Sequence, residues 1–218
     1  MNEEEKAVLM EIIQNILSDT KENKTAAPYI TPELMPNIDL YMDQVTTFMD
    51  THLASSKRYE EDKILTKTMI NNYTKNNLLP PPDKKKYSKD HLLLLTFIYY
   101  FKGIISMNDI KTLLSPLADT YFKTTEQKPL TDIYTEVLNM NKSQINDIMK
   151  DIESKFDLSK HTFKDYELSE KDALNAFAFI SSLICDIYIK KQLVEQVIDQ
   201  IGAIGQDNKA DKKLKKQL

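Results

Sequence analysis

The sequence predicts an all-α protein, and three observations lead to this prediction. The 218-residue chain has only three glycines, where an average usage of about 7% would give roughly fifteen, so it lacks the residues that tight β-hairpins need. Apolar residues recur at helical spacing over most of the chain. Helix-capping residues precede several of these segments, and prolines follow some of them. With 41% apolar and 28% charged residues, the composition is typical of a soluble folded protein.

In the first half of the chain, each predicted helix has a start or stop signal. Asn2 and Glu5 mark the start of an amphipathic helix, and Thr66 is a candidate cap for a short one. The prolines at 80–82 end that short helix, because proline cannot continue a helix. Ser88 and Ser106 are the caps of the next two, and Pro116 is expected to end the last of them. The helices predicted here lie at residues 2–18, 40–53, 65–76, 92–101 and 107–114.

The second half is predicted to be helical at residues 130–138, 145–156 and from Ser169 to about Ile204. Its most apolar stretch, residues 173–189, contains Asn175 and Asp186 and is too short for a clean membrane span. We interpret it as a buried helix. The acidic start of the chain does not resemble a signal peptide, so we expect a cytoplasmic protein without a membrane segment.

The predicted elements divide the chain into four parts. Residues 1–27 hold the N-terminal amphipathic helix and its linker, and residues 28–117 form the first folded domain. Residues 118–206 are expected to be a helical region for dimerisation or effector binding. Residues 207–218 carry five lysines and two aspartates and are expected to be a basic flexible tail.

The scarcity of glycine, cysteine and histidine argues against an enzyme. A phosphate-binding loop needs several glycines at fixed offsets, which three dispersed glycines cannot supply. Cys185 is the only cysteine, so thiolate metal sites and internal disulfides are excluded; we interpret it as a small buried apolar residue. The three histidines are far apart in sequence. We therefore expect no catalytic residues, no metal and no cofactor.

The net charge of −4 is an average over unlike segments. Residues 57–111 carry eleven basic and six acidic residues, a net charge of +5, whereas residues 1–56 have −7 and residues 112–218 have −2. The central segment contains the short helix at 65–76 and the lysines at 84–86. A cationic patch on one helix and an adjoining loop is typical of a protein that binds the phosphate backbone.

The residues of this central segment resemble a known DNA-binding family. The stretch from Leu65 to Pro82, LTKTMINNYTKNNLLPPP, is similar to the recognition-helix region of MerR-type regulators, roughly V-S-x-R-T-I-R-Y-Y-E-x-x-G-L-L-P-P. Residues 86–88 and 95–98 resemble the end of that family's wing and its third helix, and residues 105–114 resemble its fourth. The resemblance implies a winged helix-turn-helix with a shortened wing over residues 28–117, followed by a helical region that ends in a long helix.

The sequence departs from the MerR pattern at residues that bind DNA in that family. Thr68 and Asn71 take the place of arginines, and Asn72 replaces the first of two tyrosines, whereas Tyr73 keeps the second. The lysines at 84–86 replace the arginines of the wing. Arg58 is the only arginine in the chain, so the usual bidentate reader of guanine is absent, and asparagine could read adenine instead.

Over a longer stretch, residues 30–114 resemble an uncharacterised bacterial family, the domain of unknown function 1836. The resemblance rests on the segments LYMDQVTTFMD, LTKTMINNYTK and KKKYSKDHL. It implies a shared fold and leaves the activity open.

Two functions are compatible with these observations. The first is a transcriptional regulator that binds double-stranded DNA as a homodimer, with a small-molecule effector as a further partner of the C-terminal helices. The second is a protein-interaction module, derived from a helix-turn-helix, that no longer binds DNA. The candidate DNA-binding residues are Thr66, Lys67, Thr68, Asn71, Asn72, Tyr73, Lys75, Lys84, Lys85, Lys86 and Tyr87.

Overall fold

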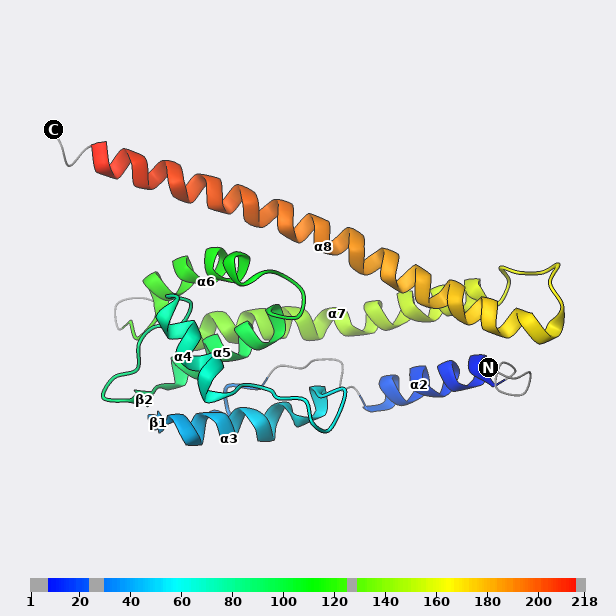
Figure 1. The fold of residues 1–218 in the computed structure, drawn as a ribbon, viewed down its shortest axis with the longest axis horizontal. Helices are drawn as coiled ribbons and strands as arrows, with labels where there is room; N and C mark the ends of the chain where they lie inside the picture. Colours follow the sequence, from blue (N-terminus) through cyan, green and yellow to red (C-terminus); the bar gives the residue numbers. More distant parts are fainter. Residues whose placement is uncertain (1–7, 24–29, 125–128, 215–218) are drawn as a thin grey trace. The chain divides into compact units, whose positions relative to one another are not determined.

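The computed structural model describes residues 8–23, 30–124 and 129–214, without the side chains of residues 22, 23, 168, 169 and 206–214. These parts of the chain are mostly helical, as predicted (Figure 1). The elements, in order, are α2 (Leu9–Asn23), β1 (Leu40–Tyr41), α3 (Met42–Leu53), the 3₁₀ helix η1 (Ala54–Ser56), α4 (Lys67–Lys75), β2 (Lys86–Tyr87), α5 (Lys89–Phe101), α6 (Met107–Tyr121), α7 (Leu130–Ser159) and α8 (Leu168–Leu214).

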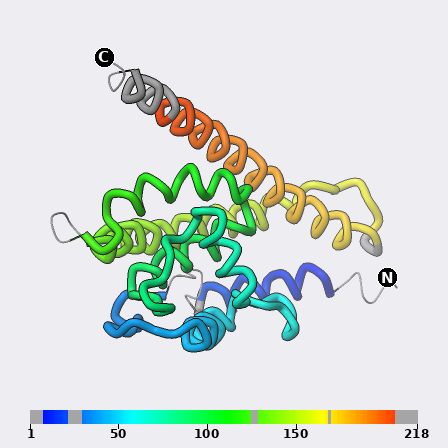
Figure 2. Tube along the Cα trace, turned by 60° about the vertical axis from the view of Figure 1, so that its left-hand side comes forward, coloured from blue at the N-terminus to red at the C-terminus, as the bar shows by residue number. Residues whose placement is uncertain are grey.

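The chain divides into two compact units, each built from separate parts of the sequence. Unit 1 comprises residues 1–27 and 140–192, and unit 2 comprises residues 28–139 and 193–218. The long helices α7 and α8, continuous in Figures 1 and 2, each belong partly to both units. The first turns of α7 contribute to the core of unit 2, and the domain boundary expected at 117 stays a prediction.

The core of unit 2 is built around α5. Eight consecutive residues of this helix, from His91 to Ile98, are buried, which confirms the prediction that an all-round apolar helix is central. Helices α3, α4 and α6 and the start of α7 contribute further residues to the same core, among them Val45, Ile70, Ile110, Leu130, Tyr134 and Leu138. The Tyr134 hydroxyl donates a 2.7 Å hydrogen bond to the Ile30 carbonyl, so α7 is fixed to the start of the unit.

The two strands form the small sheet of unit 2. They pair antiparallel, with Leu40 opposite Tyr87 and Tyr41 opposite Lys86. Residues 40–41 were expected at the start of the helix at 40–53, but that helix begins two residues later, at Met42, because Tyr41 is its extended N-cap residue. The sheet therefore ties the segment before α3 to the segment that follows α4.

Unit 1 consists of α2 with the parts of α7 and α8 that follow residue 139 and precede residue 193. Its small core contains the ring pair of Phe156 and Phe179, whose centroids are 5.3 Å apart. Lys21 of α2 forms a 2.7 Å ion pair with Glu153 of α7. The predicted helix start at Asn2 lies outside the described residues, and so does the Ser169 side chain.

Three sequence predictions about the helices are wrong. The helix at 107–114 continues through Pro116 to Tyr121, because Leu117, Ala118 and Tyr121 pack against the core and offset the hydrogen bond that proline removes. The helices predicted at 130–138 and 145–156 are one helix, since no glycine or proline separates them. The backbone of α8 also stays helical to Leu214, beyond the end predicted near Ile204.

The prediction of a buried helix at 173–189 is also wrong for most of its residues. Only Asn175, Ala176 and Phe179 are buried in this stretch, and Cys185 is exposed as well. The physical reason is that one face of α8 packs in unit 1 while the other faces solvent. An even distribution of apolar residues around a helix does not reveal which side is covered.

Candidate nucleic-acid interface

Helix α4 presents a polar half to solvent. Its exposed residues are Lys67, Thr68, Asn71, Asn72, Lys75 and the C-cap residue Asn76. At 3.6 residues per turn these side chains fall within about half of the helix circumference. None of them is acidic, so the exposed half offers hydroxyl, amide and ammonium groups only.

The opposite half of α4 fixes the helix to the core of unit 2. Ile70 is fully buried and Tyr73 is 8% exposed. At the N-terminus, the Thr66 hydroxyl accepts a 3.2 Å hydrogen bond from the Met69 amide, which confirms Thr66 as the cap. The Thr66 oxygen therefore satisfies a helix end, and this role competes with any contact to a ligand.

Helix α4 ends in a Schellman motif. Asn77 has a φ of 54°, the Leu78 amide donates to the Tyr73 carbonyl at 2.8 Å, and the Asn77 amide donates to the Thr74 carbonyl at 3.1 Å. Leu78 and Tyr73 are both buried, as this motif favours. Glycine is the usual residue at such a left-handed position, and asparagine is the next best.

We expect Asn77→Gly to stabilise unit 2 by up to about 1 kcal/mol, because glycine removes the strain of a side chain at positive φ. Urea denaturation followed by circular dichroism measures this. The matched control is Asn76→Gly, one residue earlier, where φ is −89°; glycine has no advantage there and should destabilise. Equal effects at the two positions would contradict the assignment.

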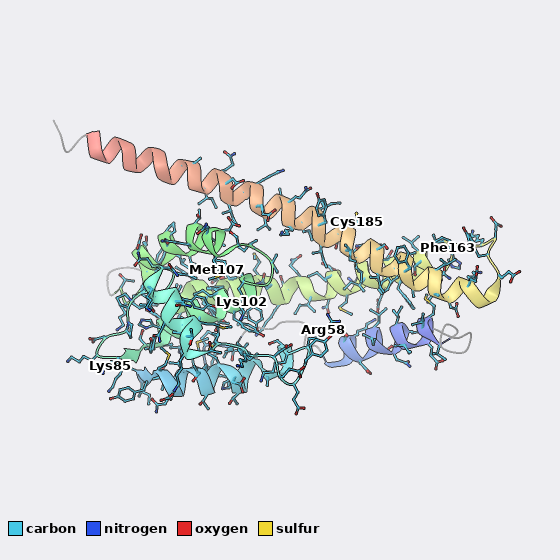
Figure 3. The ribbon with its side chains drawn as sticks, viewed as in Figure 1. Arg58, Lys85, Lys102, Met107, Phe163 and Cys185 are labelled. Atoms are coloured by element: carbon cyan, nitrogen blue, oxygen red, sulfur yellow. The ribbon has the colours of Figure 1, made fainter. Side chains whose placement is uncertain are left out.

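Between α4 and α5 the chain makes a tight turn whose centre is two lysines. The Asp83 amide donates to the Lys86 carbonyl at 3.1 Å, and the Lys86 amide donates to the Asp83 carbonyl at 2.8 Å. Lys84 and Lys85 have φ values of 46° and 65°, which is the pattern of a type I′ turn. A lysine with this left-handed backbone conformation destabilises the fold by roughly 1–2 kcal/mol relative to a glycine at the same position. Both side chains are exposed, and Figure 3 shows Lys85 at the outer edge of the unit.

The third lysine of the turn lies on the small sheet. The Lys86 ammonium is 5.1 Å from the centre of the Tyr41 ring, a cation–π distance. Its sheet neighbour Tyr87 points the other way and is 3% exposed. The strand pair thus holds the turn in place. Helix α4 ends at Lys75, five residues before the first of the prolines at 80–82.

Residues 30–137 match a family model described as a domain of unknown function (DUF1836). We call this matched segment the DUF1836 domain. No curated protein and no solved structure matches the chain. The bounds of the match agree with the packing of unit 2, since Ile30 and Tyr134 are joined by a hydrogen bond. The match supports the uncharacterised family that the sequence resembles and gives no support to the MerR-type relation.

Within the DUF1836 domain, two of the eleven candidate residues are core residues. Tyr73 and Tyr87 are 8% and 3% exposed, and burial raises the pKa of both phenols above the usual value of 10. Their rings pack in the core and hold α4 and β2 in position, and their part in DNA binding stays a prediction. The exposed candidates are Lys67, Thr68, Asn71, Asn72, Lys75, Lys84 and Lys85.

Acidic residues lie beside this surface, among them the exposed Asp83 of the lysine turn. Lys67 forms an ion pair with Asp43 of α3. Both groups are well exposed, so the pair contributes little and does not withhold Lys67 from a ligand. Further carboxylates, Asp50 and Glu60 to Asp62, line a groove between α3 and the loop that follows it. On the α3 side of α4, the lysines therefore face a group of carboxylates.

The structure adds residues that the sequence argument missed. A groove of about 480 Å³ separates the end of α4 from the start of α6. Polar groups from both helices line it: Asn72, Asn76, Asn108 and Lys111. The capping box of Ser106 and Asp109 predicts where α6 begins, but only the tertiary packing places Asn108 and Lys111 beside α4.

Among the described residues, no cluster of three or more His, Cys, Asp or Glu side chains could hold a metal ion.

Proposed function

We propose that the DUF1836 domain binds double-stranded DNA and that the protein regulates transcription. In this proposal α4 enters the major groove as the recognition helix of a helix-turn-helix, and the turn at 83–86 is a shortened wing that contacts the phosphate backbone. The observation that carries the proposal is the exposed half of α4, on which hydroxyl, amide and ammonium groups gather without a carboxylate. Such a surface complements base edges and phosphates.

The side chains of α4 divide into two roles. Asn71 and Asn72 have the amide groups that pair bidentately with adenine N6 and N7, and Thr68 has a methyl group for thymine. Lys67 and Lys75 are positioned at the two ends of the helix and supply charge for phosphates. The surface thus favours an A·T-rich site, since no arginine is present in the domain to read guanine except Arg58, whose guanidinium lies over the Tyr59 ring.

The turn supports the proposal through its rigidity. Its two reciprocal backbone hydrogen bonds and the pairing of β2 with β1 define the positions of the lysine backbone before any ligand binds. A preformed turn loses less conformational entropy on binding than a flexible lysine loop. The positive φ values of Lys84 and Lys85 are those that a type I′ turn requires.

We expect the triple variant Lys84→Ala, Lys85→Ala, Lys86→Ala to weaken DNA binding and to reduce its salt dependence. Each lost phosphate contact lowers the slope of log K against log salt by about 0.9, so the slope should fall by roughly 2–3. Fluorescence anisotropy with a pool of random-sequence duplexes measures the slope. The control with the same charge change replaces three exposed lysines of unit 1, Lys142, Lys150 and Lys164, and should keep the wild-type slope.

The asparagines should behave differently from the lysines. Asn71→Ala and Asn72→Ala should change which sequences are recovered from the random pool, at a cost of about 1–3 kcal/mol for the preferred site, and leave the salt slope unchanged. Binding that is insensitive both to salt and to the lysines would contradict the proposal.

A protein-interaction module is the second candidate function. Two features of α4 favour this second function: the helix has no arginine, and four of its six exposed side chains are neutral. The two candidates differ in one measurement. A module that has lost DNA binding enriches no duplex from the random pool at low salt.

A further inference from the structure

The groove between α4 and α6 lies within the DUF1836 domain and has the size of a ligand site. Its volume of about 480 Å³ is in the range of pockets that bind small molecules. All the residues that line it belong to unit 2. They come from the second half of α4 and its C-cap, from Leu78 just after that helix, and from the start of α6. We call this space the α4–α6 groove.

Three of the residues that line the α4–α6 groove supply apolar surface. Tyr73 and Leu78 are core residues with exposed fractions of 8% and 6%, so packing fixes the positions of their side chains. Met107 is 41% exposed, and a flexible thioether side chain adapts its shape to an apolar partner. The groove therefore combines a rigid apolar surface with one adaptable side chain, which suits the apolar body of a small ligand.

Three asparagines supply hydrogen-bonding groups to the α4–α6 groove. Asn72 and Asn76 come from α4 and its cap, and Asn108 comes from α6. The Asn76 side-chain amide donates a 2.9 Å hydrogen bond to the Asn72 backbone carbonyl. The side chains of Asn72 and Asn108 make no hydrogen bond to any residue that the structure describes. A ligand can therefore use these two amides, each a donor and an acceptor, without breaking a contact of the fold.

Lys111 gives the α4–α6 groove its charge. It is the one charged residue among those that line the groove, and it is exposed. Within the described part of the chain it forms no ion pair. Asp109, two residues earlier, accepts a 3.1 Å hydrogen bond from the Ser106 amide and so caps α6. An ammonium without a carboxylate beside it favours a ligand that carries one negative charge.

We propose that the α4–α6 groove binds a small organic molecule that has one carboxylate on an apolar body. The Lys111 ammonium and the amides of Asn72 and Asn108 bind the carboxylate, and the apolar residues of the groove contact the body. A carboxylate matches the single ammonium better than a phosphate monoester, which carries up to two negative charges near neutral pH.

A ligand in the α4–α6 groove should also affect DNA binding. Asn72 and Asn76 belong both to the groove and to the exposed half of α4. A carboxylate bound beside them repels phosphates and occupies amides that the proposed function assigns to DNA. The ligand should therefore compete with duplex DNA. This consequence rests on the proposed function, whereas the binding site itself does not.

Titration with sodium naphthoate tests the site, with NMR of the full-length chain carrying isotopically labelled methionine methyl groups. The Met107 methyl signal, identified by its loss in Met107→Leu, should shift and reach saturation. Met140 of α7 is the matched control, because it is 59% exposed and lies outside the groove, and its signal should stay in place. A Met107 signal that does not saturate, or that moves no more than the Met140 signal, would overturn the proposal.

Two further compounds separate the charge of the ligand from its body. Sodium acetate has the carboxylate without the apolar body, and naphthamide has the body without the charge. Both should bind more weakly than naphthoate in the same titration. Equal binding of naphthoate and naphthamide would contradict the role of the carboxylate, and equal binding of naphthoate and acetate would contradict the role of the apolar residues.

Lys111→Gln should weaken naphthoate binding by about threefold to fivefold, the range for an exposed ion pair, and should leave naphthamide binding unchanged. The control is Lys142→Gln, which removes an exposed lysine of unit 1 and should bind naphthoate as the wild type does. Both replaced side chains are exposed, so the methyl spectra without ligand should match that of the wild type. Equal naphthoate affinities of the two variants would overturn the assignment to Lys111.

Fluorescence anisotropy with the duplex pool separates this site from the proposed function. Saturating naphthoate should lower the DNA affinity of the wild type. If the chain binds naphthoate but no duplex at low salt, the site stands and the proposed function fails. If the chain binds both and naphthoate leaves the DNA affinity unchanged, the competition is refuted.

Discussion

Acidification from pH 6.5 to pH 4 should cost unit 2 about 3 kcal/mol of unfolding free energy through His91 alone. His91 is fully buried in α5, and burial lowers its pKa from 6.5 to about 4. The unfolded chain therefore binds a proton at a pH where the folded chain does not. The contribution of His91 is complete above pH 6.5 and is lost as the pH falls toward 4.

The surroundings of His91 explain why its neutral form is favoured. Its Nδ1 accepts a 2.9 Å hydrogen bond from the Ser88 amide at the start of α5, and protonation of that nitrogen would break the bond. The rings of Tyr87 and Phe122 contact the imidazole edge to face. The carbonyl of Pro81 raises the pKa, but this effect and that of Asp39 are smaller than the effect of burial, to which Lys123 adds.

Urea denaturation of wild type and His91→Gln between pH 7 and pH 4 measures this effect. Glutamine at the third position of a helix can accept the same Ser88 hydrogen bond but does not titrate. The unfolding free energy of the variant should therefore fall less steeply with decreasing pH. If both proteins lose stability at the same rate over this range, His91 is not the buried neutral group described here.

Tyr134→Ala should destabilise unit 2 by about 3–5 kcal/mol, the range for removal of a buried aromatic ring. Tyr134 is 1% exposed, its ring centre is 5.0 Å from that of Phe97, and its hydroxyl holds the Ile30 carbonyl at 2.7 Å. The variant loses the ring from the core and the link between α7 and residue 30.

Tyr134→Phe separates these two losses. It keeps the ring and leaves the Ile30 carbonyl without the phenol, which should cost about 1–3 kcal/mol. Tyr59→Ala, at an exposed tyrosine of the loop after α3, should change stability by no more than about 0.5 kcal/mol. The midpoint of urea unfolding ranks the three variants, and a Tyr134→Ala protein as stable as Tyr59→Ala would show that α7 is not part of the domain core.

Local signals predicted the DUF1836 domain well. The cap Thr66, the prolines at 80–82 and the apolar run of α5 each act through a few neighbouring residues, and the structure has all three where they were expected. The prediction that Pro116 ends α6 was wrong. The hydrogen bond that this proline removes is a local loss, but the packing of Leu117 and Tyr121 that offsets it depends on residues distant in sequence.

The candidate interface was predicted in part. Helical spacing alone separates the exposed residues of α4 from Ile70, but Tyr73 and Tyr87 carry a polar tip on a large ring, so the sequence could not tell whether they are surface or core. Asn108 and Lys111 were missed because a groove between two helices is formed by tertiary contacts. The apolar residues at 173–189 were predicted to be buried, because apolar spacing alone does not show whether a helix face is covered by another element.

The hydrogen bond between Tyr134 and Ile30 spans 104 residues, and this distance sets the order of events during translation. The ribosome makes Ile30 and the apolar helix α5 long before Leu130, Tyr134 and Leu138 emerge. Until then the core residues of unit 2 lack the start of α7, and Ile198 of α8, which belongs to the same core, follows later still. Nascent chains of this length expose apolar surface and are prone to aggregate. Chaperone demand and ribosome pausing should therefore matter most before residue 138 leaves the exit tunnel.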